Sequence, residues 1–254
     1  MALIKTKGFV LRAVSVGESD RIISLLTEEH GLISVSVRGA RRARSPYLMT
    51  TQVFCLGSFE LFANKNRYRL QASELIEPFS ALQQDLERLV CASHLAEVLL
   101  DALRDDLPQP VLYRLWAYSL QALCRQPDPL LAVHVAQLRL LMEIGFSPQL
   151  DRCQDCGKPV GPGSWRTSIS AGSVYCDKPS CGLRSADVRT LPSGGLACLV
   201  HIRQSPLGRL FDFRLSDDVR AFIIEFSAAY LTYHLDKVYS RLDMLRHLKA
   251  EDPG

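Results

Sequence analysis

The sequence has 254 residues, of which 47% are hydrophobic and 22% are charged. This balance is typical of a globular protein with a buried core, and it argues against wholesale disorder. No apolar run reaches the roughly 18 residues that span a bilayer, and residues 1–5 do not resemble the start of a signal peptide. We therefore expect a soluble, intracellular protein that makes no use of a membrane.

The positive charge is concentrated at the front of the chain. The formal net charge of the whole protein is +3. Residues 1–80 contain 11 basic and 7 acidic side chains, whereas residues 81–150 contain 5 basic and 8 acidic ones. An anionic partner responds to such local clusters more than to the net charge.

The first 80 residues carry the pattern of a small β-barrel. Ile33, Val35 and Val37 alternate with polar residues, and so do Tyr68 and Leu70, which is the period of a half-buried strand. About five short strands with turn residues between them predict a closed barrel of the OB or SH3-like type. The expected strands are at residues 8–11, 21–27, 33–38, 54–62 and 67–72.

Beyond Pro78 the apolar residues take up helical spacing, with prolines between the runs. Ser216 is expected to cap one helix, and Gly145 to end another. Residues 147–190 lose the helical period and gain Gly, Pro and Cys, which predicts an inserted module. The expected helices lie at residues 82–103, 110–123, 131–142, 217–230 and 235–245.

Four cysteines within this module have the spacing of a metal site. Cys153 and Cys156 form one pair, and Cys176 and Cys181 form a second pair about 20 residues later. This pattern predicts one tetrahedral, structural Zn²⁺ per chain, with a hairpin between the pairs. The second pair is separated by four residues instead of two, and a redox dithiol or an iron–sulfur cluster is the alternative use of the same ligands.

Two clusters of basic residues predict a nucleic-acid interface. A guanidinium group can donate two hydrogen bonds to one phosphate. Closely spaced basic residues of this kind are typical of proteins that bind DNA or RNA. Tyr47, Phe62 and Tyr68 lie nearby and are candidates for stacking on bases. The predicted DNA-binding residues are Arg38, Arg41, Arg42, Arg44, Lys65, Arg67 and Arg69.

The sequence contains no convincing set of catalytic residues. It lacks the phosphate-binding loop of Walker NTPases, the zincin motif and the nucleophile elbow of hydrolases. An enzyme would need an exposed thiol of low pKa or an open zinc position, and the motifs indicate neither. We therefore expect a protein that is not an enzyme.

Several segments, in the same order, resemble the bacterial RecO family of recombination mediators. The opening run Gly8-Phe9-Val10-Leu11 and the Gly39-Ala40-Arg41-Arg42 element resemble its N-terminal part. The run from Leu140 to Phe146, followed by Cys153-x-x-Cys156-Gly157, resembles its central helix and zinc module. Tyr239-Ser240-Arg241 is similar to its Lys-Ser-Arg-like segment near the C-terminus, with tyrosine in place of lysine.

The resemblance implies an α+β protein with an N-terminal OB-fold barrel at residues 1–79. An α-helical domain at residues 80–254 would follow, with the zinc module inserted at about 147–190. It also implies binding of single- and double-stranded DNA, annealing of complementary strands, and work with RecR and the single-stranded DNA-binding protein SSB. Through them it would help RecA load in the bacterial cytoplasm, in association with the nucleoid. The alternative is an adaptor that docks RecR or SSB and binds DNA only weakly.

Overall fold

The computed structural model describes residues 2–65 and 67–245 of the chain. It combines strands and helices, as the sequence predicts, and divides into two compact units, Met1–Cys124 and Arg125–Gly254. None of the described helices is both long and apolar enough to cross a membrane.

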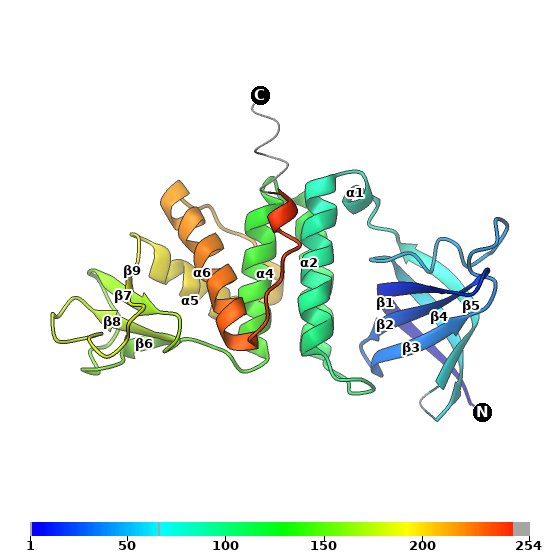
Figure 1. The fold of residues 1–254 in the computed structure, drawn as a ribbon, viewed down its shortest axis with the longest axis horizontal. Coiled ribbons are helices and arrows are strands. Elements are labelled where there is room, and N and C mark those ends of the chain that lie inside the picture. The colour runs from blue at the N-terminus through cyan, green and yellow to red at the C-terminus, as the bar shows by residue number, and fades with distance from the viewer. Residues whose placement is uncertain (1, 66, 246–254) are drawn as a thin grey trace. The chain divides into compact units, whose positions relative to one another are not determined.

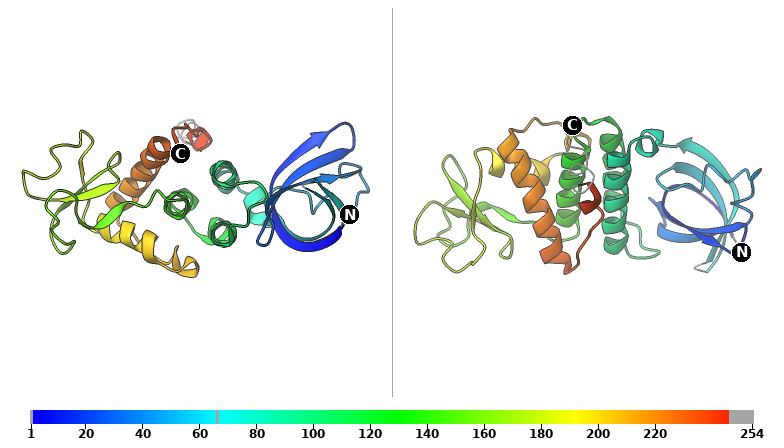
Figure 2. Two further views of the ribbon diagram at one scale, coloured as in Figure 1. Left: turned by 90° about the horizontal axis from the view of Figure 1, so that it is seen from below. Right: turned by 45° about the horizontal axis from the view of Figure 1, so that its top comes forward.

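Five strands at the start of the first unit close into a barrel, in the order β1-β2-β3-β5-β4 (Figures 1 and 2). Neighbouring strands are antiparallel except for β3 and β5, which are parallel. Long strands curve around such a barrel with the help of bulges, and the register shifts between Val10 and Arg12 of β1 and at two places in the pairing of β4 with β5. The strands are β1 (Ala2–Val16), β2 (Asp20–Thr27), β3 (Gly31–Val37), β4 (Leu56–Asn64) and β5 (Arg67–Glu77).

The predicted alternation on β3 is confirmed, because Ile33, Val35 and Val37 are buried while the intervening serines are exposed. They pack with Phe59 and Leu61 of β4 in the interior of the barrel. The expected strands are thus present, although β1 and β5 are several residues longer than the sequence pattern indicates.

Three helices complete the first unit. They are α1 (Ser80–Gln83), α2 (Leu86–Ala102) and α3 (Pro110–Arg125). The Asp85 carboxylate accepts a hydrogen bond from the Arg88 N–H and so caps α2. Aromatic contacts join α3 to the barrel, between Tyr113 and Phe9 and between Trp116 and Phe54.

The second unit joins helices to a small sheet of order β6-β8-β7-β9. A buried polar contact ties α4 to α6, because the Gln137 side chain donates to the Ser227 hydroxyl, which donates to the His134 carbonyl. Burial of these groups is tolerated because they are paired. The elements are α4 (Pro129–Glu143), β6 (Gln149–Cys153), β7 (Trp165–Ser168), β8 (Ser173–Cys176), β9 (Arg189–Thr190), α5 (Gly195–Gln204), η1 (Leu207–Arg209) and α6 (Asp217–Leu235).

The C-terminal part differs from the sequence prediction in three respects. The helix expected at 235–245 is wrong for residues 236–242, because Asp236 takes a left-handed conformation (φ +49°), α6 ends at Leu235, and Val238 is 74% exposed, while residues 243–245 are helical as expected. Ser216 precedes α6 as expected, but its hydroxyl bonds the Asp218 carboxylate instead of a backbone N–H. Helix α5 has no counterpart in the sequence prediction, because the continuous apolar run from Leu196 to Val200 hides the helical spacing of its buried residues Cys198, Leu199 and Ile202.

The turn between β2 and β3 requires glycine at residue 31. Gly31 has a φ of +68°, and a Cβ atom built there would lie 2.2 Å from the Leu107 carbonyl oxygen. We expect Gly31→Ala to destabilise the first unit by on the order of 3 kcal/mol, in part from the 1–2 kcal/mol cost of left-handed geometry and in part from the clash. The midpoint of urea unfolding, followed by circular dichroism, measures this loss.

Gly17→Ala is the matched control. Gly17 has a similar φ of +56°, but nothing lies within 4 Å of the added Cβ. This variant should lose only the backbone contribution, and equal losses in the two variants would show that the Leu107 contact is unimportant.

Candidate functional site

The four predicted metal ligands come together at one end of the small sheet. The Sγ atoms of Cys153, Cys156, Cys176 and Cys181 all lie within 4.8 Å of one another. The Cys156–Cys176 and Cys176–Cys181 sulfur distances are 3.6 and 3.7 Å. Tetrahedral zinc with Zn–S bonds of about 2.3 Å places its sulfurs about 3.8 Å apart, so the cluster fits one ion. A disulfide would need sulfurs about 2.05 Å apart, and all four cysteines are free.

Two tight turns aim the sulfurs inward. Gly157 and Gly182 follow the second cysteine of each pair, and both have a positive φ, +71° and +79°. The Asp155 carboxylate, within the first turn, accepts a hydrogen bond of 2.6 Å from the Gly182 N–H in the second. The β7–β8 hairpin between the pairs is formed as predicted.

Arg166 of β7 holds the wider second turn together. Its Nη2 atom lies 2.8 to 3.0 Å from the carbonyl oxygens of Cys176, Lys178 and Cys181 and donates to them. The two cysteines of this pair are thereby fixed at the ends of a loop that is longer than usual.

The cluster disfavours four negative charges in the absence of a cation. Burial opposes ionisation of Cys153, but the N–H groups of Cys156, Cys176 and Asp155 prevail and lower the pKa of this thiol to about 6. Burial and the neighbouring sulfurs raise the pKa of Cys181 to about 12. A divalent cation at the centre would relieve this repulsion, and the four donors leave no open position for a substrate.

The arginine-rich segment that follows β3 is anchored to the β1–β2 turn. The Asp20 carboxylate accepts hydrogen bonds of 2.8 Å from the Gly39 N–H and 2.9 Å from the Ser19 hydroxyl. These bonds, aided by the charges of Arg38 and Arg42, hold the pKa of Asp20 below its usual value. The Arg41 N–H also donates to the Ser19 carbonyl.

Further contacts hold the same segment against the barrel. Ala40 is fully buried in the barrel core, which leaves the arginines around it on the outside. The Tyr47 hydroxyl donates to the Gln71 carbonyl of β5, and the Thr50 hydroxyl bonds that of Ser73. Arg38, Arg41, Arg42 and Arg44 are all exposed. The segment therefore presents its arginines from a fixed support rather than from a free loop.

The second basic cluster lies on the strand next to β3. Arg67 and Arg69 are exposed, while Leu70 points into the core. The parallel pairing of Ser36 with Arg69 sets β5 beside β3, so the two predicted clusters are on neighbouring strands. The Arg69 guanidinium lies 5.5 Å from the centre of the Phe62 ring, and Lys65 lies in the β4–β5 turn.

Sequence reasoning missed several residues of these sites. Asp20 and Arg166 have ordinary polar surroundings in the sequence, and only the folded chain shows what they bind. Arg12 is exposed on β1 and pairs across the ladder with Ser24, on the same outer surface as Ser34 and Ser36 of β3. In the sequence, only the position of Arg12 directly after the expected strand at residues 8–11 indicates that its side chain belongs to the barrel surface.

Comparison with known proteins matches the chain to two family models. Residues 1–79 match "Recombination protein O N terminal", and residues 83–242 match "Recombination protein O C terminal".

Individual relatives cover nearly the whole chain. The DNA repair protein RecO of Acetivibrio thermocellus is 32% identical over 249 residues, which make up 98% of each protein. That of Anaeromyxobacter sp. (strain K) is 34% identical over 93% of each, and that of Clostridium acetobutylicum is 27% identical over 99% of this chain and 100% of the relative. The chain therefore belongs to the RecO family of DNA repair proteins.

Proposed function

We propose that this protein is a non-catalytic DNA-binding recombination mediator. It binds single- and double-stranded DNA, anneals complementary strands and helps load the recombinase onto SSB-coated DNA, together with RecR. The observation that carries the proposal is the arginine-rich segment, which is anchored to the barrel with its guanidinium groups exposed. Family membership supports the role in repair.

Residues 1–79 are the DNA-binding domain in this proposal, and we infer that their barrel is an OB fold. Its five strands and the order β1-β2-β3-β5-β4 support that inference. Residues 80–254 form the helical domain, with the zinc module at about 147–190.

The phosphate track combines both basic clusters. Arg38, Arg41, Arg42 and Arg44 bind one stretch of backbone, and Lys65, Arg67 and Arg69 extend the track along β5. Between the two clusters, Ser34 and Ser36 of β3 have small exposed side chains. A DNA strand can therefore approach the backbone of β3 without a steric clash. Two strands whose phosphates are held on one cationic surface repel each other less, and complementary bases can then meet without ATP.

The cysteine cluster holds a structural zinc ion in this proposal. Cys153, Cys156, Cys176 and Cys181 are the ligands, and a bound Zn²⁺ supplies a rigid cross-link rather than a reaction centre. The module buries Trp165, Val174 and Tyr175 of its own sheet, and the ion would stabilise its fold further by joining the two cysteine turns.

Strand annealing tests the function directly. Two complementary oligonucleotides coated with the cognate SSB are mixed without ATP, and duplex formation is followed with and without the protein. Faster annealing supports the mediator. If the protein is folded and zinc-loaded but has no effect, and if it binds RecR or SSB firmly, the docking adaptor is the better description.

We expect Arg42→Ala with Arg44→Ala to weaken binding to single-stranded DNA. Each lost phosphate contact should reduce the slope of log K against log salt by about 0.7. These two arginines are preferred to Arg41, whose guanidinium bonds the Gly17 carbonyl and helps to hold the segment. Fluorescence anisotropy across a salt series measures the slope.

Arg114→Ala is the control for that experiment. Arg114 is exposed on α3 of the same unit and is not one of the residues of the proposed track. It should leave the slope unchanged, and a double variant with the parental slope would refute the assignment of the segment.

Asp20→Asn is expected to loosen the arginine-rich segment, because the neutral amide is a weaker acceptor for the Gly39 N–H. Trypsin should then cut after the arginines of this segment several-fold faster, as measured by mass spectrometry of timed digests. Glu18→Gln, in the same turn, is the control and should be cut at the parental rate. Folding lowers the pKa of Asp20. The stabilisation that its carboxylate gives to the arginine-rich segment is therefore complete above the usual carboxyl pKa of about 4, and it is lost as the pH falls through the lowered pKa. Equal cutting in all three proteins would contradict the role of Asp20.

Arg166→Gln is expected to release zinc about tenfold faster to a chelating dye, because partners of the ligand loops tune metal affinity. Arg184→Gln, exposed in the same module, should release it at the parental rate.

Elemental analysis of the unmutated protein should find about one zinc per chain. Iron in place of zinc, with a visible absorption band, would favour the iron–sulfur alternative.

A further inference from the structure

Helix α6 is apolar on two faces, and only one of them packs against α4. Val219, Ile223 and Ser227 are buried on the packed side. On the other side Phe222 and Ala229 are half-buried, and Tyr233 is 55% exposed. A helix that is apolar around most of its circumference is usually covered on all sides. Phe226 on this side is buried, so the apolar surface that remains open is that of Phe222, Ala229 and Tyr233, and this surface is suited to contact another molecule.

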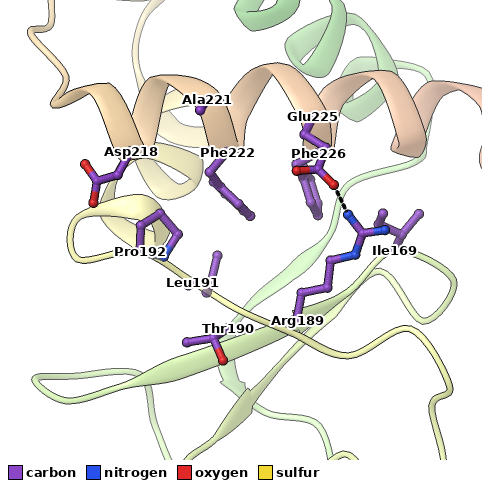
Figure 3. A pocket seen from close by; sticks show the side chains of 10 residues that line it. All are labelled: Ile169, Arg189, Thr190, Leu191, Pro192, Asp218, Ala221, Phe222, Glu225 and Phe226. Carbon is purple, nitrogen blue, oxygen red and sulfur yellow. Dashed lines mark hydrogen bonds and ion pairs between the residues drawn. The ribbon is translucent and has the colours of Figure 1, made fainter.

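Two adjoining hollows lie along this second face. The first, of about 400 Å³, lies between Phe222 and Phe226 of α6 and the segment Leu191-Pro192 after β9 (Figure 3). The second, a shallower one of about 500 Å³, is lined by Ala228, Ala229, Thr232 and Tyr233 of the helix. Ile169 lines both hollows, so they adjoin each other. From Asp218 to Tyr233 they follow α6 for about 22 Å, the length of a short peptide segment. We call them together the α6 groove.

The rim of the α6 groove is acidic. Three carboxylates line it, those of Asp187, Asp218 and Glu225, against one guanidinium, that of Arg189. Burial opposes the charge of Asp187, but hydrogen bonds from Ser168 and Ser170 prevail and hold its pKa at about 2, so it stays negative at neutral pH. This surface attracts cations, in contrast to the arginine-rich surface of the barrel.

One ion pair crosses the groove and is weak enough to be replaced. Arg189 reaches from β9 to Glu225 of α6, as Figure 3 shows. Their side chains are 50% and 70% exposed, and water screens pairs of that kind. A cation on an incoming chain can therefore take the place of Arg189 beside Glu225.

We propose that the α6 groove binds a basic segment of a partner protein that carries a large apolar anchor. The anchor inserts between Leu191 and Phe222, where apolar surface lines a hollow of the size typical of binding pockets. Lysine or arginine side chains on either side of it face Asp218, Glu225 and Asp187. The inference is independent of the proposed DNA binding, since it uses other residues and the opposite charge.

The test uses the full-length, metal-loaded protein and two fluorescein-labelled peptides of about 16 residues, a length that covers the groove. One peptide combines leucine and lysine at helical spacing, and the other has glutamate in place of each lysine. Fluorescence anisotropy should show binding of the lysine peptide only. Asp218→Asn with Glu225→Gln should weaken this binding at least fivefold, and Phe222→Ala should weaken it as well.

Asp217→Asn is the matched control, because Asp217 is exposed at the start of the same helix and does not line the groove. It should bind the lysine peptide as the parent does. Asp218→Asn and Glu225→Gln change surface side chains and should not disturb folding. They therefore test the proposal even if Phe222→Ala fails to fold. Their DNA affinity should be unchanged, which separates this inference from the proposed function.

Three results would overturn the proposal. The first is equal binding of both peptides, and the second is binding that the groove variants leave unchanged. The third is self-association of the protein that the charge variants abolish, as seen by analytical ultracentrifugation, because a second copy of the chain would then be the occupant.

Discussion

The parallel pairing of β3 with β5 closes the barrel, and the position of the arginine-rich segment on its surface depends on it. The paired residues, Val35 with Tyr68 and Ser36 with Arg69, are more than 30 residues apart in the chain, whereas the other adjacent strands pair in the antiparallel manner. Closure brings the apolar sides of all five strands into one core. Because the pair is parallel, the chain that leaves β3 must cross the end of the barrel before it can begin β4. The arginine-rich segment is that crossing, which explains why it lies beside β5.

Local patterns in the sequence are sufficient for the barrel strands, for the β7–β8 hairpin and for the cysteine cluster, but not for β6 and β9. The alternation around Val35 depends only on which side chains face the core, and the cysteine spacing depends only on the geometry of two short turns. The features that were missed depend on contacts across the fold. Asp20 matters because Gly39 is folded back onto it, and Arg166 matters because three carbonyl groups converge on it. The end of α6 was misjudged because the apolar period continues past Asp236, while the backbone turns there into a left-handed conformation.

Arginine plays opposite parts in the two sites. Arg166 is turned inward, and its hydrogen bonds to carbonyl groups fix the backbone around the thiols. Arg42 and Arg44 are turned outward, and their own segment is fixed by other residues, chiefly the buried Ala40 and the Asp20 carboxylate. In both sites hydrogen bonds and burial fix the backbone, so the charged groups have defined positions. This would lower the entropic cost of binding the proposed ion or phosphate.

The contacts between the barrel and α3 bear on how the chain can be divided in the laboratory. The two matched family segments meet between residues 79 and 83, inside the first compact unit. The rings of Phe9 and Phe54 are buried there against Tyr113 and Trp116, and the Leu32 carbonyl accepts a hydrogen bond from the Asp106 N–H. A fragment that stops at residue 79 would expose those rings to water and leave an aggregation-prone surface. A cut after residue 124 retains the helices that bury those rings, so the fragment to express is the whole first compact unit rather than the 79 residues that match the N-terminal family model.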